Sequence, residues 1–128
     1  MSKSSSKLSP SKGIVYLVGA GPGDPGLLTL KAKECIEAAD VLIYDYLSNP
    51  EFLRMAKAGS ERIYAGKKAK DHTLTQDEIN ALIVRLGNEG KRVARLKSGD
   101  PMIFGRAGEE LDALRAAGIA YQIVPGIT

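Results

Sequence analysis

A loop rich in glycine and proline follows an apolar run near the start of the chain. The run covers residues 14–18, and the loop reads Gly-Ala-Gly-Pro-Gly-Asp-Pro over residues 19–25. Short apolar runs are typical of buried strands, and in an open α/β sheet the carboxyl ends of the strands face the crevice where ligands bind. Because glycine allows close approach without a side-chain clash, we expect the binding site of this chain at this loop.

Two familiar phosphate-binding loops fit this stretch poorly. A dinucleotide fingerprint requires glycine at the sixth place from Gly19, but Asp24 stands there, and its carboxylate would oppose a pyrophosphate. A Walker loop requires Gly-Lys-Ser/Thr after four spacer residues, whereas Gly26 is followed by two leucines. Turn chemistry leaves a structural alternative, in which Pro22 and Pro25 only stiffen a strand-to-helix turn.

Composition and charge describe one ordinary globular domain. The 128 residues are 44% hydrophobic and 26% charged, which leaves room for a real core. The net charge of +3 does not require a nucleic-acid partner, and no apolar run is long enough to span a membrane. Residues 1–12 lack the apolar core of a signal peptide, so we expect a flexible leader before a domain at residues 13–128. The single cysteine, Cys35, is expected to be a small buried side chain in a reducing cytoplasm.

Apolar runs alternate with helical patterns, which is typical of βαβ units around a mostly parallel sheet. The sequence therefore predicts an α/β fold with an open, five-stranded sheet flanked by helices. The expected strands cover residues 14–18, 41–44, 62–64, 92–96 and 121–124. The expected helices cover residues 28–39, 50–58, 76–88 and 107–117. Thr75 and Glu78 predict a capping box at the start of the third helix, and Gly59, Gly90 and Gly118 lie near helix ends, where a left-handed residue is favoured.

Polar residues follow each expected strand, and a parallel sheet would bring these loops to one rim. In strand order they are Pro22 and Asp24, then Asp45, then Lys67, then Ser98, Gly99 and Asp100, and finally Thr128. In a dinucleotide enzyme the acidic residue that closes the second strand would hold a ribose hydroxyl. A dinucleotide-dependent oxidoreductase therefore stays open as an alternative, as does a non-catalytic ligand-binding domain. His72 stands alone and gives no case for a metal site.

Several motifs, in order and in register, resemble those of the tetrapyrrole methylase family. They lie at residues 15–32, 40–45, 66–67, 95–106 with the two glutamates that follow, and 124–128. The resemblance is strongest to the amino-terminal domain of the members that methylate uroporphyrinogen III. It implies S-adenosylmethionine as cofactor, the dimethylated product precorrin-2, a place in sirohaem or cobalamin biosynthesis, and a homodimer for the full-length protein. Methylation of a different precorrin is the alternative within the family.

The resemblance also implies roles for particular residues. The cofactor pocket would be lined by Pro22, Ser98, Gly99, Asp100, Ile103 and Thr128. The proton acceptor would be Asp45, and the proton donor Lys67. A tight turn suits a ligand with an ammonium, a carboxylate and a sulfonium, and a positioned carboxylate and ammonium can move protons. From the residues alone, Asp45 or Asp100 could instead cap a loop, and Lys67 could be solvated.

Departures from the family pattern bear on specificity more than on the cofactor. Ser98 stands where the family often has glycine, and Tyr46 stands where it often has arginine. The basic residues in the loops suit a substrate that bears many carboxylates; they are Lys67, Lys68, Lys70 and Arg106. The resembling enzymes continue into a second α/β domain that supplies the other wall of the cleft. We therefore expect little or no methyltransferase activity from the 128-residue chain alone.

Overall fold

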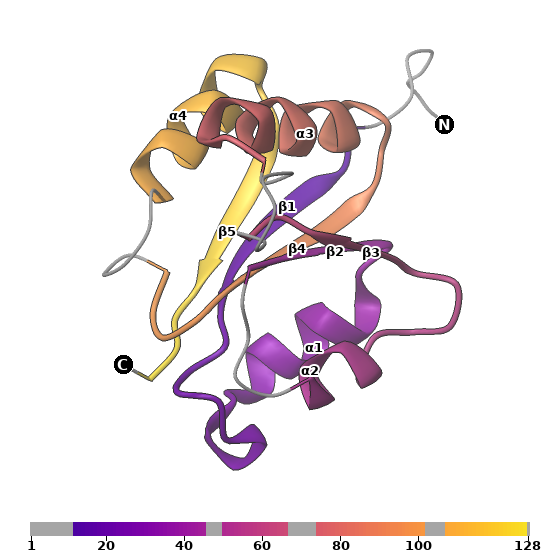
Figure 1. The fold of residues 1–128 in the computed structure, drawn as a ribbon. Helices are drawn as coiled ribbons and strands as arrows, with labels where there is room; N and C mark the ends of the chain where they lie inside the picture. Colours follow the sequence, from indigo (N-terminus) through magenta and orange to yellow (C-terminus); the bar gives the residue numbers. More distant parts are fainter. Residues whose placement is uncertain (1–11, 46–49, 67–73, 102–106, 128) are drawn as a thin grey trace.

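The computed structural model describes residues 12–45, 50–66, 74–101 and 107–127, and it forms a sheet with helices on both faces (Figure 1). The strands are β1 (Ile14–Gly19), β2 (Val41–Tyr44), β3 (Glu61–Tyr64), β4 (Arg92–Lys97) and β5 (Ala120–Val124). The helices are α1 (Leu30–Ala38), α2 (Glu51–Arg54), α3 (Gln76–Asn88) and α4 (Ala107–Ala117), with a 3-10 turn, η1 (Pro25–Leu27), before α1. The predicted α/β fold is confirmed.

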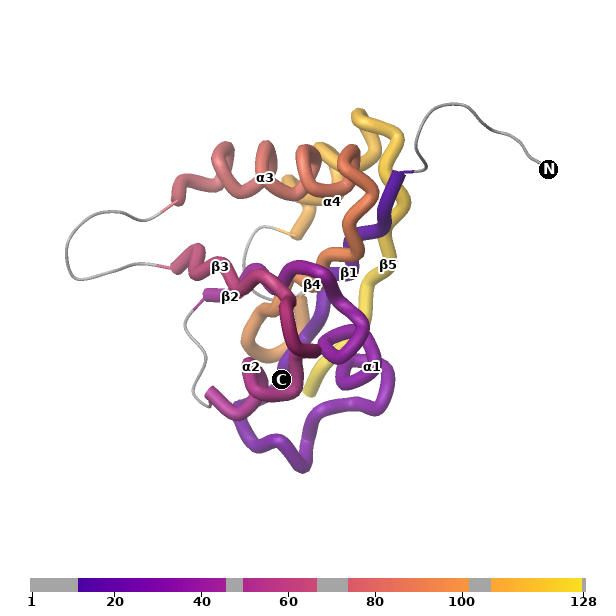
Figure 2. Tube along the Cα trace, turned by 90° about the vertical axis from the view of Figure 1, so that its right-hand side faces the viewer, coloured from indigo at the N-terminus to yellow at the C-terminus, as the bar shows by residue number. Residues whose placement is uncertain are grey.

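All four strand pairings are parallel, and the strand order is β3-β2-β4-β1-β5. Every carboxyl end therefore lies at one rim of the sheet. Helices α1 and α2 cover one face and α3 and α4 cover the other (Figures 1 and 2). The neighbours β1 and β4 lead to helices on opposite faces, which makes their carboxyl ends the topological switch point of the sheet. In open α/β folds, ligands bind in the crevice at such a point.

The core has two layers, one on each face of the sheet. On the face of α3 and α4, Leu17 of β1 belongs to the same buried cluster as Ile83 and Leu114. On the other face, Val18 clusters with Ile36 of α1. Successive residues of a strand point to opposite faces, so a strand covered on both sides is apolar throughout. This is why the central strands β1 and β2 read as short apolar runs, whereas the edge strands β3 and β5 are more exposed and less apolar.

The first helix begins later than the predicted residue 28. Thr29 is its N-cap, because the Thr29 hydroxyl accepts a hydrogen bond from the Ala32 backbone N–H at 3.1 Å. The residues before it form the separate turn η1, which Asp24 caps by accepting a hydrogen bond from the Gly26 N–H at 2.8 Å. Both caps satisfy backbone donors that a new turn leaves open.

The second helix is shorter than the predicted range 50–58, which was wrong at its carboxyl end. Pro50 makes no side-chain cap bond at its start. At its end, the N–H groups of Met55 and Ala56 donate to the carbonyls three residues earlier, at 3.3 and 3.4 Å. Bonds of this spacing tighten the chain into a 3-10 turn, so regular helix is confined to Glu51–Arg54.

Several local predictions are confirmed. The capping box at the start of α3 is present, with bonds of 2.8 and 3.1 Å between Thr75 and Glu78. The three glycines expected near helix ends all have positive φ; they are Gly59, Gly90 and Gly118. Cys35 is buried. Among the described helices, none is long and apolar enough to cross a membrane.

Candidate functional site at the carboxyl rim of the sheet

The loops after β1 and β4 are joined by a short antiparallel bridge between Gly21 and Gly99. The Gly99 N–H donates to the Gly21 carbonyl at 2.9 Å, and the Gly21 N–H donates to the Gly99 carbonyl at 3.2 Å. Both glycines have a left-handed φ, of 73° and 66°, which side chains rarely adopt. The bridge brings Pro22 next to Ser98 and Gly99 at the switch point, so three of the residues expected around the cofactor lie together.

The loop after β5 joins the same cluster through its glycine. A Cβ atom on Gly126 would lie 2.4 Å from the Gly99 carbonyl oxygen, and one on Gly19 would lie 2.5 Å from that same oxygen. The carboxyl ends of β1, β4 and β5 accordingly run side by side in Figure 1. We call these four residues the glycine cradle: Gly19, Gly21, Gly99 and Gly126. Backbone crowds two of its members, because a Cβ on Gly19 or on Gly126 would lie within 2.7 Å of backbone atoms of the neighbouring loops.

The residues expected around the cofactor differ in their exposure to solvent. Pro22 and Ser98 are exposed, whereas Asp100 is half-buried in the turn after β4. Ile103 and Thr128 lie outside the described residues. Asp24, which stands where a dinucleotide fingerprint has glycine, is engaged in capping η1. The loop after β1 is therefore shaped by its own cap and by its bond to the loop after β4.

Asp45 lies at the same rim, directly after β2, and is held by Arg95 of β4. The Arg95 Nη1 donates to Asp45 Oδ1 and its Nη2 donates to Asp45 Oδ2, both at 3.2 Å. The Arg95 side chain is 2% exposed, whereas that of Asp45 is 39% exposed. The buried guanidinium of Arg95 thus donates two hydrogen bonds to the solvent-exposed carboxylate of Asp45. Two parallel bonds of this kind are charge-assisted and fix the orientation of both groups.

The other end of Arg95 is held by Glu110 of α4, whose side chain is fully buried. Three donors converge on Glu110 Oε2: Arg95 Nε at 3.3 Å, Lys97 Nζ at 3.4 Å and Gln76 Nε2 at 3.2 Å. The second oxygen of this carboxyl, Oε1, has no hydrogen-bond partner among the described residues. We call Asp45, Arg95, Lys97 and Glu110 the charge network.

Burial changes the pKa of one member of the network, Lys97. Lys97 is 5% exposed, and its burial, with Arg95 nearby, lowers its pKa from 10.5, while Glu110 and Asp45 oppose that shift. Arg95 and Lys97 are two residues apart on β4, so both point toward α4. Neither residue was expected at the site from the sequence. The available signal was a pair of basic residues at alternating positions in a strand expected to be buried on both faces.

Lys67, the expected proton donor, lies outside the described residues, but the segment before it is placed. The Ala65 N–H donates to the Tyr44 carbonyl at 2.8 Å, which continues the β2–β3 pairing up to the residue before Asp45. The rings of Tyr44 and Tyr64 meet edge to face at 5.4 Å. Tyr44 thus packs against Tyr64, and the chain leaves β3 at the same rim as Asp45.

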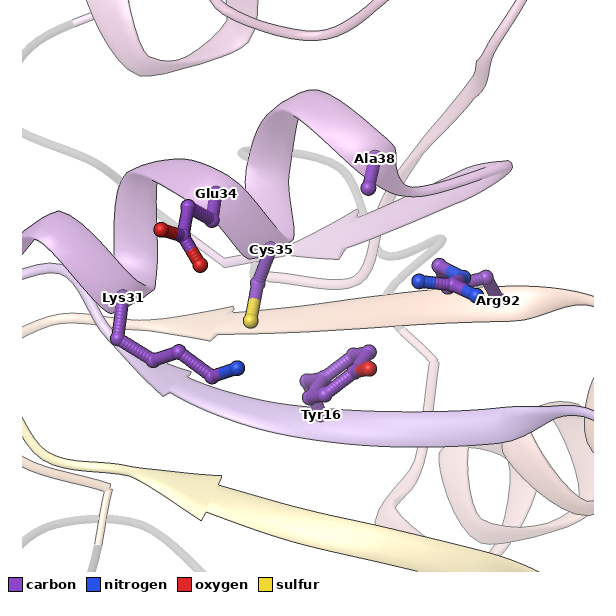
Figure 3. A pocket seen from close by; sticks show the side chains of 6 residues that line it. All are labelled: Tyr16, Lys31, Glu34, Cys35, Ala38 and Arg92. Carbon is purple, nitrogen blue, oxygen red and sulfur yellow. The ribbon is translucent and has the colours of Figure 1, made fainter.

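A separate pocket lies between α1 and the sheet, on the face away from the charge network (Figure 3). It is lined by Tyr16, Lys31, Glu34, Cys35, Ala38 and Arg92 and has a volume of about 140 Å³. In Figure 3 the Cys35 sulfur points toward the sheet between Lys31 and Tyr16. Burial raises the pKa of the Cys35 thiol, which disfavours the reactive thiolate. Ligand pockets usually have volumes of about 300–1,000 Å³, so this one is too small for a nucleoside-sized ligand.

A metal centre finds no support in the part of the chain that the structure describes. No three His, Cys, Asp or Glu residues in it gather closely enough to hold an ion. The charge network contains two carboxylates, but both are bonded to basic side chains.

The sequence pattern of a known protein family matches almost the whole chain. The family described as Tetrapyrrole (Corrin/Porphyrin) Methylases matches residues 14–128. Among curated proteins, the siroheme synthase of Nitrosospira multiformis is 58% identical over 119 residues, which are 93% of this chain and 25% of that protein. The chain therefore spans about a quarter of the length of this curated relative.

Solved structures match the fold as well as the sequence. The uroporphyrin-III C-methyltransferase from Thermus thermophilus superimposes with a TM-score of 0.79 at 48% identity, over 91% of this chain and 48% of that one. A structure described as the same Thermus thermophilus enzyme complexed with S-adenyl homocysteine matches with a TM-score of 0.77 at 47% identity, over 91% of this chain and 49% of that one.

Proposed function

We propose, from the premise that this chain belongs to the tetrapyrrole methylase family, that it forms part of an S-adenosylmethionine-dependent C-methyltransferase. Its substrate would be uroporphyrinogen III and its product precorrin-2, on the way to sirohaem or cobalamin. The observation that carries the proposal is the glycine cradle, which joins three loops at the switch point of the sheet. The similar enzyme from Thermus thermophilus is described in complex with S-adenyl homocysteine, which supports the same ligand here.

The residues at the cradle fit S-adenosylmethionine chemically. This cofactor supplies a methyl group bound to a positively charged sulfur, and it also carries an ammonium and a carboxylate. Backbone walls let a ligand approach closely, and the carboxylate of Asp100 suits an ammonium group. The residues that would hold the cofactor are Pro22, Ser98, Gly99, Asp100, Ile103 and Thr128. A dinucleotide is disfavoured, because Asp24 replaces the glycine of that fingerprint and caps η1 instead.

The exposed carboxylate of Asp45 suits the role of proton acceptor. When a pyrrole carbon takes a methyl group, a π electron pair of the ring forms the new C–C bond and the donor's C–S pair stays on sulfur. The tetrapyrrole then gives up a proton, which needs an acceptor. Asp45 lies at the rim with 39% of its side chain exposed, so a bound substrate could reach it. Lys67, one residue after the described segment that ends at Gly66, would be the proton donor.

The substrate assignment also draws on charge. Uroporphyrinogen carries many carboxylates, and basic residues that line a cleft raise the local concentration of an acidic substrate. The sequence has such residues after β3 and after β4, at Lys67, Lys68, Lys70 and Arg106, all of which lie outside the described residues. For the full-length protein we further propose a homodimer in the cytoplasm, with no nucleic-acid or membrane partner. Sedimentation equilibrium of the full-length protein tests the dimer.

The central test is ligand binding measured by calorimetry. We expect S-adenosylhomocysteine to bind the full-length protein that contains this sequence, and NAD not to bind. Gly99→Trp, which puts a bulky side chain on a cradle residue with a φ of 66°, should abolish binding. Gly108→Trp should preserve it, because nothing lies within 4 Å of a Cβ on Gly108. Binding of NAD in place of S-adenosylhomocysteine would favour the oxidoreductase alternative.

Turnover of uroporphyrinogen III completes the test. The full-length protein should form precorrin-2, and the 128-residue chain should show little or no activity, because one domain supplies only one wall of the cleft. Equal rates for the two would refute the expected inactivity of the shorter chain. Turnover of another precorrin but not of uroporphyrinogen III would overturn the substrate assignment while leaving the reaction class in place.

A further inference from the structure

The charge network contains hydrogen bonds that the proposed proton transfer does not explain. Arg95 divides its guanidinium between two carboxylates, with both Nη atoms on Asp45 and Nε on Glu110. We propose that Arg95 is a positioning residue, which holds the Asp45 carboxylate in one orientation at the rim, and that Glu110 in turn holds Arg95. This inference rests on the proposed role of Asp45 in the reaction.

The geometry leaves Arg95 little freedom to turn. A guanidinium is planar, so two bonds to Asp45 and a third to Glu110 determine the plane of the group. Arg95 and Glu110 are almost fully enclosed, at 2% and 0% exposed, and charge-assisted bonds are stronger in a poorly hydrated interior. Asp45 follows the last residue of β2, where the described strand ends. The strand β2 therefore ends before Asp45 and does not hold it, and the rigidly held Arg95 side chain fixes the orientation of the Asp45 carboxylate instead.

The charge balance also points to Asp45 as part of one unit. Arg95 and Lys97 bring two basic side chains into the interior, and Glu110 supplies one buried carboxylate. Asp45 supplies the second, so the network balances only when its exposed member is included. If Arg95 only neutralised buried charge, its bond to Glu110 would be enough for that role. The two further bonds from its Nη atoms to Asp45 would then have no purpose.

The expected effect is a loss of turnover and not of cofactor binding. Arg95→Lys keeps a positive charge but removes the two-pronged grip. Small misplacements of a reacting group can cost on the order of a hundredfold in rate. We therefore expect kcat to fall by about tenfold to a hundredfold, with the affinity for S-adenosylhomocysteine changed by less than about twofold, because the glycine cradle is untouched.

The deciding experiment is a double-mutant cycle in the full-length protein that contains this sequence. The variants are Asp45→Asn, Arg95→Lys and the two combined, and the control is Arg92→Lys, an exposed arginine on the same strand. If Arg95 acts through Asp45, the double variant should be no slower than Asp45→Asn alone. Arg92→Lys should leave kcat within about twofold of the unaltered protein. Multiplication of the two separate losses in the double variant would overturn the inference.

The cycle separates this inference from the proposed function. If Asp45→Asn leaves kcat unchanged, the role of Asp45 fails and the inference fails with it. If Asp45→Asn lowers kcat but the losses multiply, only the inference fails. Thermal melting and S-adenosylhomocysteine affinity of each variant report on folding and on the cradle independently of turnover.

Glu110→Gln provides a second route if Arg95→Lys does not fold. This variant keeps the shape of the side chain and removes the charge that anchors Arg95. We expect a smaller fall in kcat, of about threefold to tenfold, because the grip on Asp45 survives with a looser anchor. The fall should again vanish in the Asp45→Asn background. A fall of the same size in both backgrounds would show that Glu110 acts apart from Asp45 and would overturn the inference.

Discussion

Gly126 and Gly99 lie so close that a Cβ atom on Gly126 would be 2.4 Å from the Gly99 carbonyl oxygen. The contact is between backbones, so neither residue can move aside as a side chain could. It fixes the loop after β5 against the loop after β4 at the point where β1 also ends. The shape of the proposed cofactor site thus depends on the absence of side chains at a few positions.

Gly126→Ala should therefore weaken both folding and binding. A methyl group forced against backbone costs about 1–3 kcal/mol of unfolding free energy, and we expect the affinity for S-adenosylhomocysteine to fall at least about tenfold. Gly108→Ala is the matched control. Its Cβ would meet nothing within 4 Å, and replacing glycine by alanine within a helix stabilises by about 0.5–1 kcal/mol. Urea unfolding and calorimetry measure the two effects, and unchanged affinity in Gly126→Ala would contradict the prediction.

Lys97 should make stability rise with pH in the alkaline range. Its pKa in the folded chain lies below the ordinary 10.5 because the ammonium is buried, so the unfolded chain binds more protons between these two values. The free energy of unfolding therefore increases as pH rises through that window. Lys97→Met should remove this part of the slope in urea unfolding at a series of pH values. The control is Lys91→Met at an exposed position, and equal slopes in the two variants would argue against the prediction.

Asp40 should contribute stability that disappears in acid. The pKa of this carboxyl is lowered because the Arg92 backbone N–H donates to it at 2.8 Å and Lys57 donates to it at 2.9 Å. Its contribution is present above the ordinary pKa of 3.8 and is lost as pH falls through the lowered value. Asp40→Asn should be less stable than the unaltered chain at pH 7, with the difference vanishing at low pH. A difference independent of pH would contradict this origin.

Cys35 should react slowly with thiol reagents in the folded chain. Its side chain is 4% exposed, and burial raises the pKa of the thiol, so little thiolate is present near neutral pH. Colorimetric titration with a disulfide reagent at pH 8 should show at least about tenfold faster reaction after unfolding in urea. Comparable rates in the folded and unfolded chain would show that the thiol is accessible.

The sequence was a good guide where local patterns decide the structure. The apolar runs predicted β1, β2 and β4 because these strands are largely buried, and the two edge strands were recognised although they are more exposed. Thr75 with Glu78 identified the start of α3. It was a poorer guide at the end of α2, where weak hydrogen bonds end the helix without a marked cap. The turn η1 and its cap Asp24 were not predicted either, because a single 3-10 turn depends on local backbone geometry and not on a repeated pattern.

The pairing of residues within the charge network could not be predicted, for a different reason. Asp45 was expected at the rim from its place after a strand, but its grip by Arg95 depends on the strand order. That order makes β4 the neighbour of β2, although β3 and α3 lie between them in the chain. Glu110 reaches the same cluster from α4. Pattern and spacing along the chain do not encode which distant elements become neighbours.

The strand order also bears on how the chain acquires its structure during synthesis. Of the five strands of this sheet, β1 is synthesised first, yet its neighbours in the sheet are β4 and β5, which follow β2 and β3 in the chain. Its backbone groups must wait, unpaired, until residues beyond 90 have emerged. Pairings between such distant segments slow folding. A nascent chain stalled between β3 and β4 would thus expose an aggregation-prone apolar strand, a natural ligand for a chaperone.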